Sequence, residues 1–249
     1  MYQDFLKYTL FGIKEKRYSS DVMEMSEVTI GFVLLTFVAS FAACFFSTLS
    51  GGGAGLILLP ILIFTGLPFI NALASHKFAV GFIGIGSTFR YLKENLIDWK
   101  VFWWTALAGI PFVIFGTRFA AAVPGEIMKP LVGGVILAMV FISLIRSKAQ
   151  DVFHPKKLTG KTLFWGTLLL FPMAFYSGWI SAGSGVFTTF LYLWLLKYDQ
   201  LHATAMTISA NGILWNGVGM IAHVFMGHVI WPIAPGLVLG AIVGSYLGA

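Results

Sequence analysis

Long apolar stretches separated by short polar loops dominate this chain of 249 residues and restrict what it can fold into. A helix needs about 20 apolar residues to cross the hydrocarbon core of a bilayer. Seven stretches reach or approach that length: Val28–Leu49, Ala72–Leu92, Trp99–Val123, Ile127–Arg146, Thr162–Ala182, Leu201–Met226 and Val229–Gly248. A soluble domain has about 25% charged residues, whereas this chain has 10%. The sequence therefore predicts an all-α polytopic protein embedded in the lipid bilayer.

Two shorter apolar segments, Leu56–Ile70 and Val186–Leu196, each follow a glycine-rich cluster. Gly51–Gly55 precedes the first segment, and Gly183–Gly185 precedes the second. Apolar segments of about 10–14 residues are often re-entrant or half-helical. We therefore predict about seven spanning helices plus two short broken or re-entrant segments. The alternative is that these glycines serve tight helix packing or a plain turn.

The two glycine clusters open two similar series of residues. Each series continues with a segment of small residues, a tryptophan, and a glycine 17 residues after that tryptophan. The pairs are Gly53–Gly55 with Gly183–Gly185, Ala72–Lys77 with Ala203–Ile208, Trp99 with Trp231, and Gly116 with Gly248. This order predicts a duplication, with a first transmembrane repeat over residues 28–146 and a second over residues 162–249; a coincidence of glycines is the alternative. Only the first repeat continues past its last glycine, so the second is expected to lack a last C-terminal helix.

Basic residues between the apolar runs predict the orientation, because Lys and Arg concentrate in cytoplasmic loops. The loop over residues 147–161 is basic, and so is the loop near Arg90 and Lys100. Both loops are expected on the cytoplasmic side of the cytoplasmic membrane, and residues 1–27 form a polar N-terminal extension. If the first short segment is re-entrant, the N-terminus lies inside and the repeats are parallel. If it crosses fully, the N-terminus lies outside and the repeats are inverted.

None of the ten acidic residues lies deep inside an apolar run. Proton and sodium pathways often use intramembrane carboxylates, so a cation pump built on a carboxylate relay is disfavoured. Lys77, beside His76, is the exception among the basic residues, and an ionisable residue inside a membrane indicates a functional site. The alternatives are a lysine that snorkels to the interface and a histidine that hydrogen-bonds to the backbone or to Ser75.

The glycine clusters have a physical use in binding an anion. Glycine allows positive φ and close backbone approach, and a helix N-terminus after a break exposes N–H groups with positive dipole character. Broken helices at corresponding places of two repeats point to a transporter site. The substrate-binding candidates are Gly53, Gly55, Ser75, His76, Lys77, Gly183, Ser184, Gly185, Thr207 and Asn211. For Asn211, as for Asn216, hydrogen bonding between helices is the alternative role.

Motifs of enzyme chemistry are absent from the sequence. Thr159–Thr162 resembles the end of a phosphate-binding loop, but Pro155 stands where that motif requires glycine. His223 and His228 have no carboxylate or Cys partners in the sequence around them, so no metal site is predicted. We expect no catalytic residue, no cofactor and no nucleic-acid partner. The expected partners are a small anionic substrate and the lipid bilayer, and the oligomeric state stays open.

Taken in order, these motifs resemble the sulfite exporter TauE/SafE family of membrane permeases over roughly residues 28–249. The residues that carry the resemblance are Gly51–Pro60, Ala72–Lys77, Arg90-Tyr91-Leu92 and Ile97-Asp98-Trp99, repeated more loosely from Ser177 to Trp231. The resemblance implies a permease for sulfur-containing anions such as sulfite or organosulfonates in the cytoplasmic membrane. Ser75-His76 stands where the family usually has Thr-Asn, which leaves the identity of the anion open.

The resulting hypothesis is a secondary transporter that binds a small anion where the two glycine breaks converge. An anion channel, a non-transporting membrane scaffold subunit and a polytopic membrane enzyme are the alternatives. Flux that does not saturate would indicate the channel. Co-purification with a fixed partner and no flux would indicate the scaffold.

Overall fold

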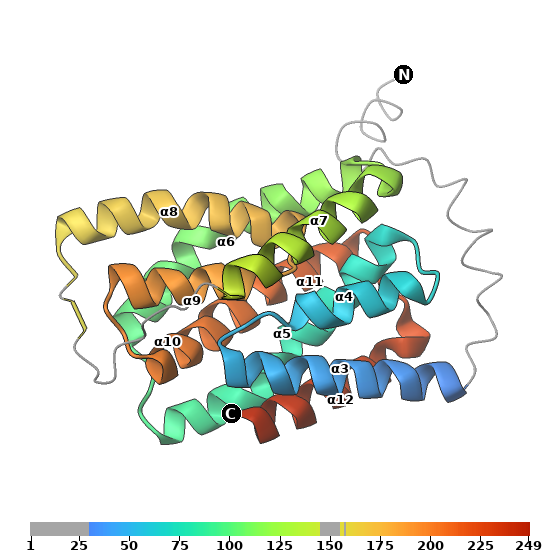
Figure 1. The fold of residues 1–249 in the computed structure, drawn as a ribbon, viewed down its shortest axis with the longest axis horizontal. Helices are drawn as coiled ribbons and strands as arrows, with labels where there is room; N and C mark the ends of the chain where they lie inside the picture. Colours follow the sequence, from blue (N-terminus) through green and yellow to red (C-terminus); the bar gives the residue numbers. More distant parts are fainter. Residues whose placement is uncertain (1–29, 145–154, 157) are drawn as a thin grey trace.

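A computed structural model describes residues 30–144, 155, 156 and 158–249, and every regular element in these ranges is helical. The elements in chain order are α3 (Ile30–Ser50), α4 (Ala54–Phe64), α5 (Phe69–Lys93), α6 (Trp99–Ala122), α7 (Gly125–Leu144), α8 (Gly160–Trp179), α9 (Ser184–Leu195), α10 (Gln200–Thr207), η2 (Ile208–Trp215), α11 (Asn216–Phe225), η3 (Trp231–Ile233) and α12 (Ala234–Gly248). Most of them lie side by side along one long axis (Figure 1). The helical class predicted from the apolar runs is confirmed.

Four helical stretches among the described residues are long and apolar enough to cross a membrane: Ile30–Ser50, Phe69–Lys93, Trp99–Ala122 and Trp231–Gly248. The prediction of seven spans is therefore not confirmed. The apolar run predicted as one helix over Leu201–Met226 changes its winding halfway, because the π-helical segment η2 separates α10 from α11. The chain does end in a helix, α12, so the expectation that a C-terminal helix is missing is not confirmed either.

A short apolar helix lies near each predicted short segment, but with different bounds. The segment expected over Leu56–Ile70 ends as α4 at Phe64, because Gly66 has a φ of 90° and Pro68 begins the next helix as its N-cap. The helix expected to reach Ala182 ends at Trp179, because Ser181 has a φ of 68° and turns the chain. In both places the backbone turns inside a continuous apolar run.

The two halves of the chain pack crosswise through glycines. The helix α12 lies along α3, and α6 lies along α8. On α12, the glycines at every fourth position face backbone carbonyls of α3: Gly236, Gly240, Gly244 and Gly248 meet Val33, Phe37, Phe41 and Phe45. On α6, Gly116 faces the carbonyl of Phe175 on α8. Small residues of this kind let membrane helices approach closely, so α12 lies directly against α3, and α6 lies directly against α8.

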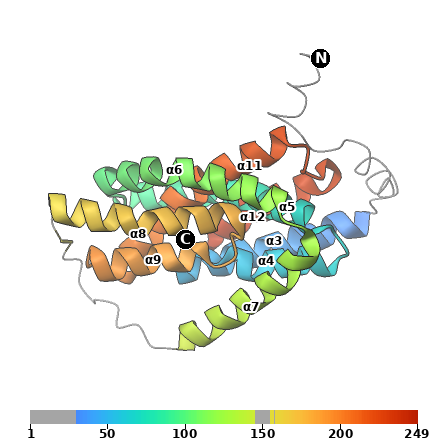
Figure 2. The same ribbon diagram turned by 90° about the horizontal axis from the view of Figure 1, so that it is seen from above.

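The helices α4 and α9 point in opposite directions from the centre of the molecule. They begin close together and extend to opposite ends, in Figure 1 and again in the view from above in Figure 2. Opposed directions are expected of inverted repeats and not of parallel ones. The duplication itself, and the repeat boundaries at 28–146 and 162–249, stay predictions.

Three loops meet at one end of the bundle. The amide of Lys156 donates to the carbonyl of Leu196 at 2.8 Å, and the hydroxyl of Tyr198 donates to Oδ2 of Asp98 at 3.0 Å. These contacts join the α5–α6, α7–α8 and α9–α10 connections, where the basic residues of the predicted cytoplasmic loops concentrate (Figure 1). The predicted extension over residues 1–27, and most of the loop over 147–161, lie outside the described residues.

The glycine contacts between α3 and α12 lead to a stability prediction. In Gly240→Ala the new Cβ would press on the carbonyl oxygen of Phe37 and lie 2.9 Å from the amide of Phe41. Overpacking of this kind costs about 1–3 kcal/mol, so we expect a lower midpoint of thermal unfolding in detergent. The matched control is Gly133→Ala on α7, where nothing lies within 4 Å of the added Cβ. Equal midpoints for the two variants would contradict the packing described here.

Candidate functional site

The two glycine breaks meet at the centre of the molecule. A Cβ built on Gly52 would lie 2.7 Å from Cα of Gly185, and a Cβ on Gly185 would lie 2.9 Å from Cα of Gly52. Gly52 also has a φ of 120°, in the region that L side chains avoid. Two segments that are more than a hundred residues apart in the chain are thus in backbone contact, which only glycine permits.

The helices that leave this contact, α4 and α9, begin without a side-chain cap. Gly53 is the N-cap of α4 and Gly183 is the N-cap of α9, with φ of 102° and 75°. Neither helix has an acidic residue in its first turn. A helix N-terminus carries partial positive charge and unpaired N–H groups, so two such ends converge on one place.

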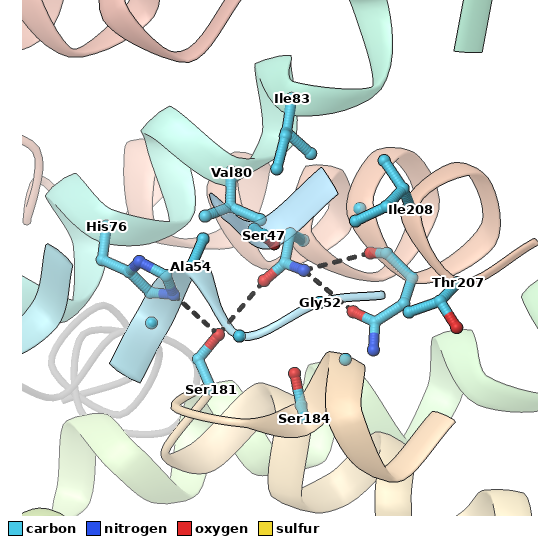
Figure 3. A pocket seen from close by; sticks show the side chains of 16 residues that line it. Ser47, Gly52, Ala54, His76, Val80, Ile83, Ser181, Ser184, Thr207 and Ile208 are labelled. Atoms are coloured by element: carbon cyan, nitrogen blue, oxygen red, sulfur yellow. Dashed lines mark hydrogen bonds between the residues drawn. The ribbon is translucent and has the colours of Figure 1, made fainter. Parts of the chain in front are cut away.

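A small cavity of about 30 Å³ lies at this meeting point (Figure 3). Its walls come from the end of α3, both glycine breaks, the starts of α4 and α9, α5, the end of α10, η2 and the start of α11. The lining residues are Ser47, Gly52, Gly53, Ala54, Gly55, His76, Val80, Ile83, Ser181, Ser184, Gly185, Thr207, Ile208, Asn211, Gly212 and Asn216. None of them is acidic, so an anion here would meet no repelling carboxylate from its walls.

A row of hydrogen bonds runs along one wall of the cavity. Nε2 of His76 lies 3.2 Å from Oγ of Ser181, which donates to Oδ1 of Asn216 at 3.2 Å. Nδ2 of Asn216 donates to Oδ1 of Asn211 at 2.9 Å, and Nδ2 of Asn211 donates to Oγ1 of Thr188 at 3.0 Å. Figure 3 shows the contact between Ser181 and His76 as a dashed line. Asn211 therefore lines the cavity and also makes the interhelical bond considered as its alternative role.

Lys77 lies directly behind this wall. Its Nζ donates to the carbonyl of Ser177 at 2.7 Å and lies 3.5 Å from both Oγ of Ser181 and Oδ1 of Asn216. The residue is fully buried, so its side chain does not snorkel to an interface. The stem packs on α11 where Gly219 leaves room, since a Cβ there would lie 2.9 Å from Cδ of Lys77. The lysine thus places its nitrogen behind two lining residues, and all three of these acceptors are uncharged.

The structure brings most of the predicted site residues together. Seven line the cavity: Gly53, Gly55, His76, Ser184, Gly185, Thr207 and Asn211. Three do not: Gly183 caps α9, Lys77 lies behind the wall, and Ser75 is buried with no partner for its Oγ among the described residues. Whether any of them binds substrate stays a prediction.

Sequence reasoning missed two serines that line the cavity, Ser47 and Ser181. Ser181 lies two residues before the N-cap glycine of α9, so its nearness to the glycine cluster was an available signal. Ser47 lies near the end of α3, on the turn before the first break, and nothing in the run of similar residues around it distinguishes it.

The chain is similar in sequence to one known protein family and to several bacterial membrane proteins. The family profile described as "Sulfite exporter TauE/SafE" matches residues 36–249. A "Probable membrane transporter protein ORF9" of Sinorhizobium sp is 29% identical over 90% of this chain and 83% of its own length. A "Probable membrane transporter protein" of Haemophilus influenzae is 24% identical over 90% of this chain and 86% of its own length.

A third relative, "Probable membrane transporter protein YfcA" of Escherichia coli K12, is 25% identical over 87% of this chain and 77% of its own length. No solved structure matches the chain. The profile match runs from Thr36, inside α3, to the end of α12, and includes both glycine breaks and the cavity between them. The chain therefore belongs to the sulfite exporter TauE/SafE family of membrane transporter proteins.

Proposed function

We propose that this protein is a secondary transporter that moves small anions, in particular sulfur-containing oxyanions such as sulfite or organosulfonates, across the cytoplasmic membrane. The observation that carries the proposal is the convergence of two uncapped helix N-termini on a cavity without acidic lining residues. Exposed N–H groups at a helix start, with the helix dipole behind them, form a ready site for an oxyanion.

Backbone groups and side chains of the described residues bind the anion together. Backbone N–H groups at the starts of α4 and α9 hold the anion from two sides. Lys77 adds positive charge from behind Ser181 and Asn216, at 3.5 Å from a side-chain oxygen of each. His76 and Ser181 supply hydrogen-bonding groups at the wall. The small volume of the cavity favours a compact oxyanion over a large organic acid.

Movement of the anion requires access from each side in turn. The helices α4 and α9 start at the site and extend towards opposite ends of the molecule (Figure 1). Each break therefore belongs to a hairpin that opens towards a different side, α3–α4 at one end and α8–α9 at the other. Rocking of one half against the other around a fixed central site is the usual way in which such paired broken helices alternate access.

The test is flux of ³⁵S-labelled sulfite into proteoliposomes that contain the purified protein. We expect flux that saturates with sulfite concentration and exceeds the leak of protein-free vesicles. Lys77→Ala and Gly55→Val should both reduce it strongly, because a Cβ on Gly55 already lies 3.0 Å from Nε2 of His76 and 2.9 Å from Cα of Ala182. The control Gly134→Ala, in open space on α7, should transport like the wild type.

Other outcomes would overturn the proposal. If both site variants transport like the wild type, the site is wrong. Flux that rises without saturation would identify a channel. No flux, with a second protein that co-purifies at fixed ratio, would identify a scaffold subunit.

A further inference from the structure

A pair of buried histidines lies outside the cavity, at the end of α11. Nδ1 of His223 lies 3.0 Å from Nδ1 of His228, which follows in the connection to η3. His223 is fully buried and His228 is 4% exposed. Nε2 of His223 has no hydrogen-bond partner among the described residues. A buried imidazole nitrogen without a partner is costly, so this arrangement calls for an explanation beyond packing.

The geometry of the pair fixes how it can hold protons. Two Nδ1 atoms at 3.0 Å need one N–H donor and one lone-pair acceptor. The uncharged pair therefore has one proton between the rings. A further proton on Nε2 of His223 leaves that bond intact, with His223 as the donor, whereas protons on both Nδ1 atoms would break it. Either ring can be the donor, so the pair has room for one added proton at Nε2 of the donating ring, and Nε2 of His223 is the one without a partner among the described residues.

One face of α11 runs from the wall of the candidate anion site to the histidine pair. Asn216, Gly219 and His223 lie three and four residues apart on α11, so they share a face. Lys77 of α5 lies on this face, because it contacts Gly219 and reaches Asn216. The positive charge of Lys77 disfavours a proton on His223, so the two residues do not readily carry a charge at the same time. The lysine thus lies between the cavity wall and the histidines.

A second contact ties the pair to the same two helices. Nδ2 of Asn71, on α5, donates to the carbonyl of His228 at 2.9 Å. The charged or titratable groups that act on His223 are Lys77 from α5 and His228 from the next connection. Burial lowers the pKa of His228.

We propose that His223 and His228 form a proton-binding site, which exchanges protons with Lys77 and couples anion transport to a proton. The proposal rests on the proposed function and names its coupling ion. In the step that joins the two sites, the N–H bond at Nζ of Lys77 breaks and a new one forms at Nε2 of His223, either directly or through water. Lysine loses one positive charge and the histidine pair gains one, so the charge behind the anion site depends on where the proton lies.

The direction of the effect follows from this exchange. With the proton on Lys77, positive charge lies at the cavity and favours a bound anion. With the proton on the histidine pair, Lys77 is neutral and the anion is held less strongly. A proton gradient across the membrane should therefore drive net anion movement, while exchange of one anion for another needs no net proton movement.

The experiment separates these two activities in the same proteoliposomes. Exchange is measured as entry of ³⁵S-sulfite into vesicles that contain unlabelled sulfite, with equal pH on both sides. Driven uptake is measured with empty vesicles and a more acidic outside, after subtraction of the leak into protein-free vesicles. We expect His223→Gln and His228→Gln to keep exchange within about twofold and to lose about tenfold or more of driven uptake. His202→Gln, on α10 and away from the histidine pair (Figure 1), is the matched control and should keep both.

The outcomes distinguish failure of the proposed function from failure of the coupling proposal. If the wild type shows no exchange, the proposed function fails and the coupling fails with it. If the wild type exchanges sulfite but gains nothing from the pH gradient, only the coupling proposal is overturned. It is also overturned if both histidine variants keep driven uptake, or if both lose exchange to the same extent as driven uptake, since the pair would then be structural.

Discussion

Gly52→Ala is expected to abolish sulfite flux and to destabilise the protein, because two independent costs meet at this residue. A φ of 120° strains an L residue, at a cost of about 1–3 kcal/mol. The added Cβ would also lie 2.7 Å from the backbone of Gly185, and that backbone belongs to the other glycine break. Overpacking adds about 1–3 kcal/mol. Flux in proteoliposomes and thermal unfolding in detergent measure the two effects.

Two neighbouring variants separate strain from collision. Gly53→Ala has the strain, with a φ of 102°, but its nearest new contact is a flexible leucine tip at 3.3 Å. Gly185→Ala has the collision, with Cα of Gly52 at 2.9 Å, while its own φ is not positive. We expect Gly53→Ala to lose stability with smaller loss of flux, and Gly185→Ala to lose flux strongly. A Gly52→Ala protein that transports like the Gly134→Ala control would show that the breaks do not need to meet.

Lys77→Met is expected to lower sulfite flux about tenfold or more while the midpoint of thermal unfolding stays level or rises. The reason is that Nζ is fully buried and its three hydrogen-bond acceptors are uncharged. Removal of a buried charge that no opposite charge compensates does not cost stability in itself. A residue kept at such a cost is expected to serve function, and here the function is attraction of an anion.

The variant Lys77→Arg tests whether a positive charge at this position is enough for flux. The larger guanidinium keeps the charge but does not fit where the lysine stem packs on Gly219, so flux should fall here too. Lys100→Met, on the exposed start of α6, is the matched control for loss of one lysine and should leave flux unchanged. If Lys77→Met unfolds at a clearly lower temperature and retains flux, the lysine is a structural residue.

Composition and local pattern were enough to predict the kind of protein and the places where its helices break. Hydropathy depends on residue type alone, so the apolar runs are visible without any knowledge of contacts. The glycine clusters were visible for the same reason, since left-handed backbone at Gly53 and Gly183 requires a residue without Cβ.

The bounds of the elements were less predictable, because apolar side chains continue through turns that the backbone makes. The chain turns between α4 and α5 at Gly66 and Pro68, inside an apolar run. Both residue types favour turns, so they were an available signal for the end of the first short segment. The π-helical winding of η2 has no such signal. Within and beside it, Asn211 and Asn216 hydrogen-bond to each other and Asn211 bonds to Thr188 of α9, contacts that the local sequence does not reveal.

The arrangement of the site could be predicted only in part. That Gly52 and Gly185 touch, and that Ser181 joins His76 to Asn216, depends on contacts between residues far apart in the chain. The position of Lys77 behind the wall depends on the same contacts. Residue types pointed to an anion site, but the packing of the two halves decides which polar groups face the cavity.

The most direct measurement is the position of a bound anion in a crystal or cryo-EM structure of the full chain with selenite, a heavier analogue of sulfite. The selenium is expected in the cavity, within hydrogen-bonding distance of backbone nitrogens at the starts of both α4 and α9. Selenium bound elsewhere, or a cavity that stays empty of selenite in protein that transports sulfite in vesicles, would contradict the account.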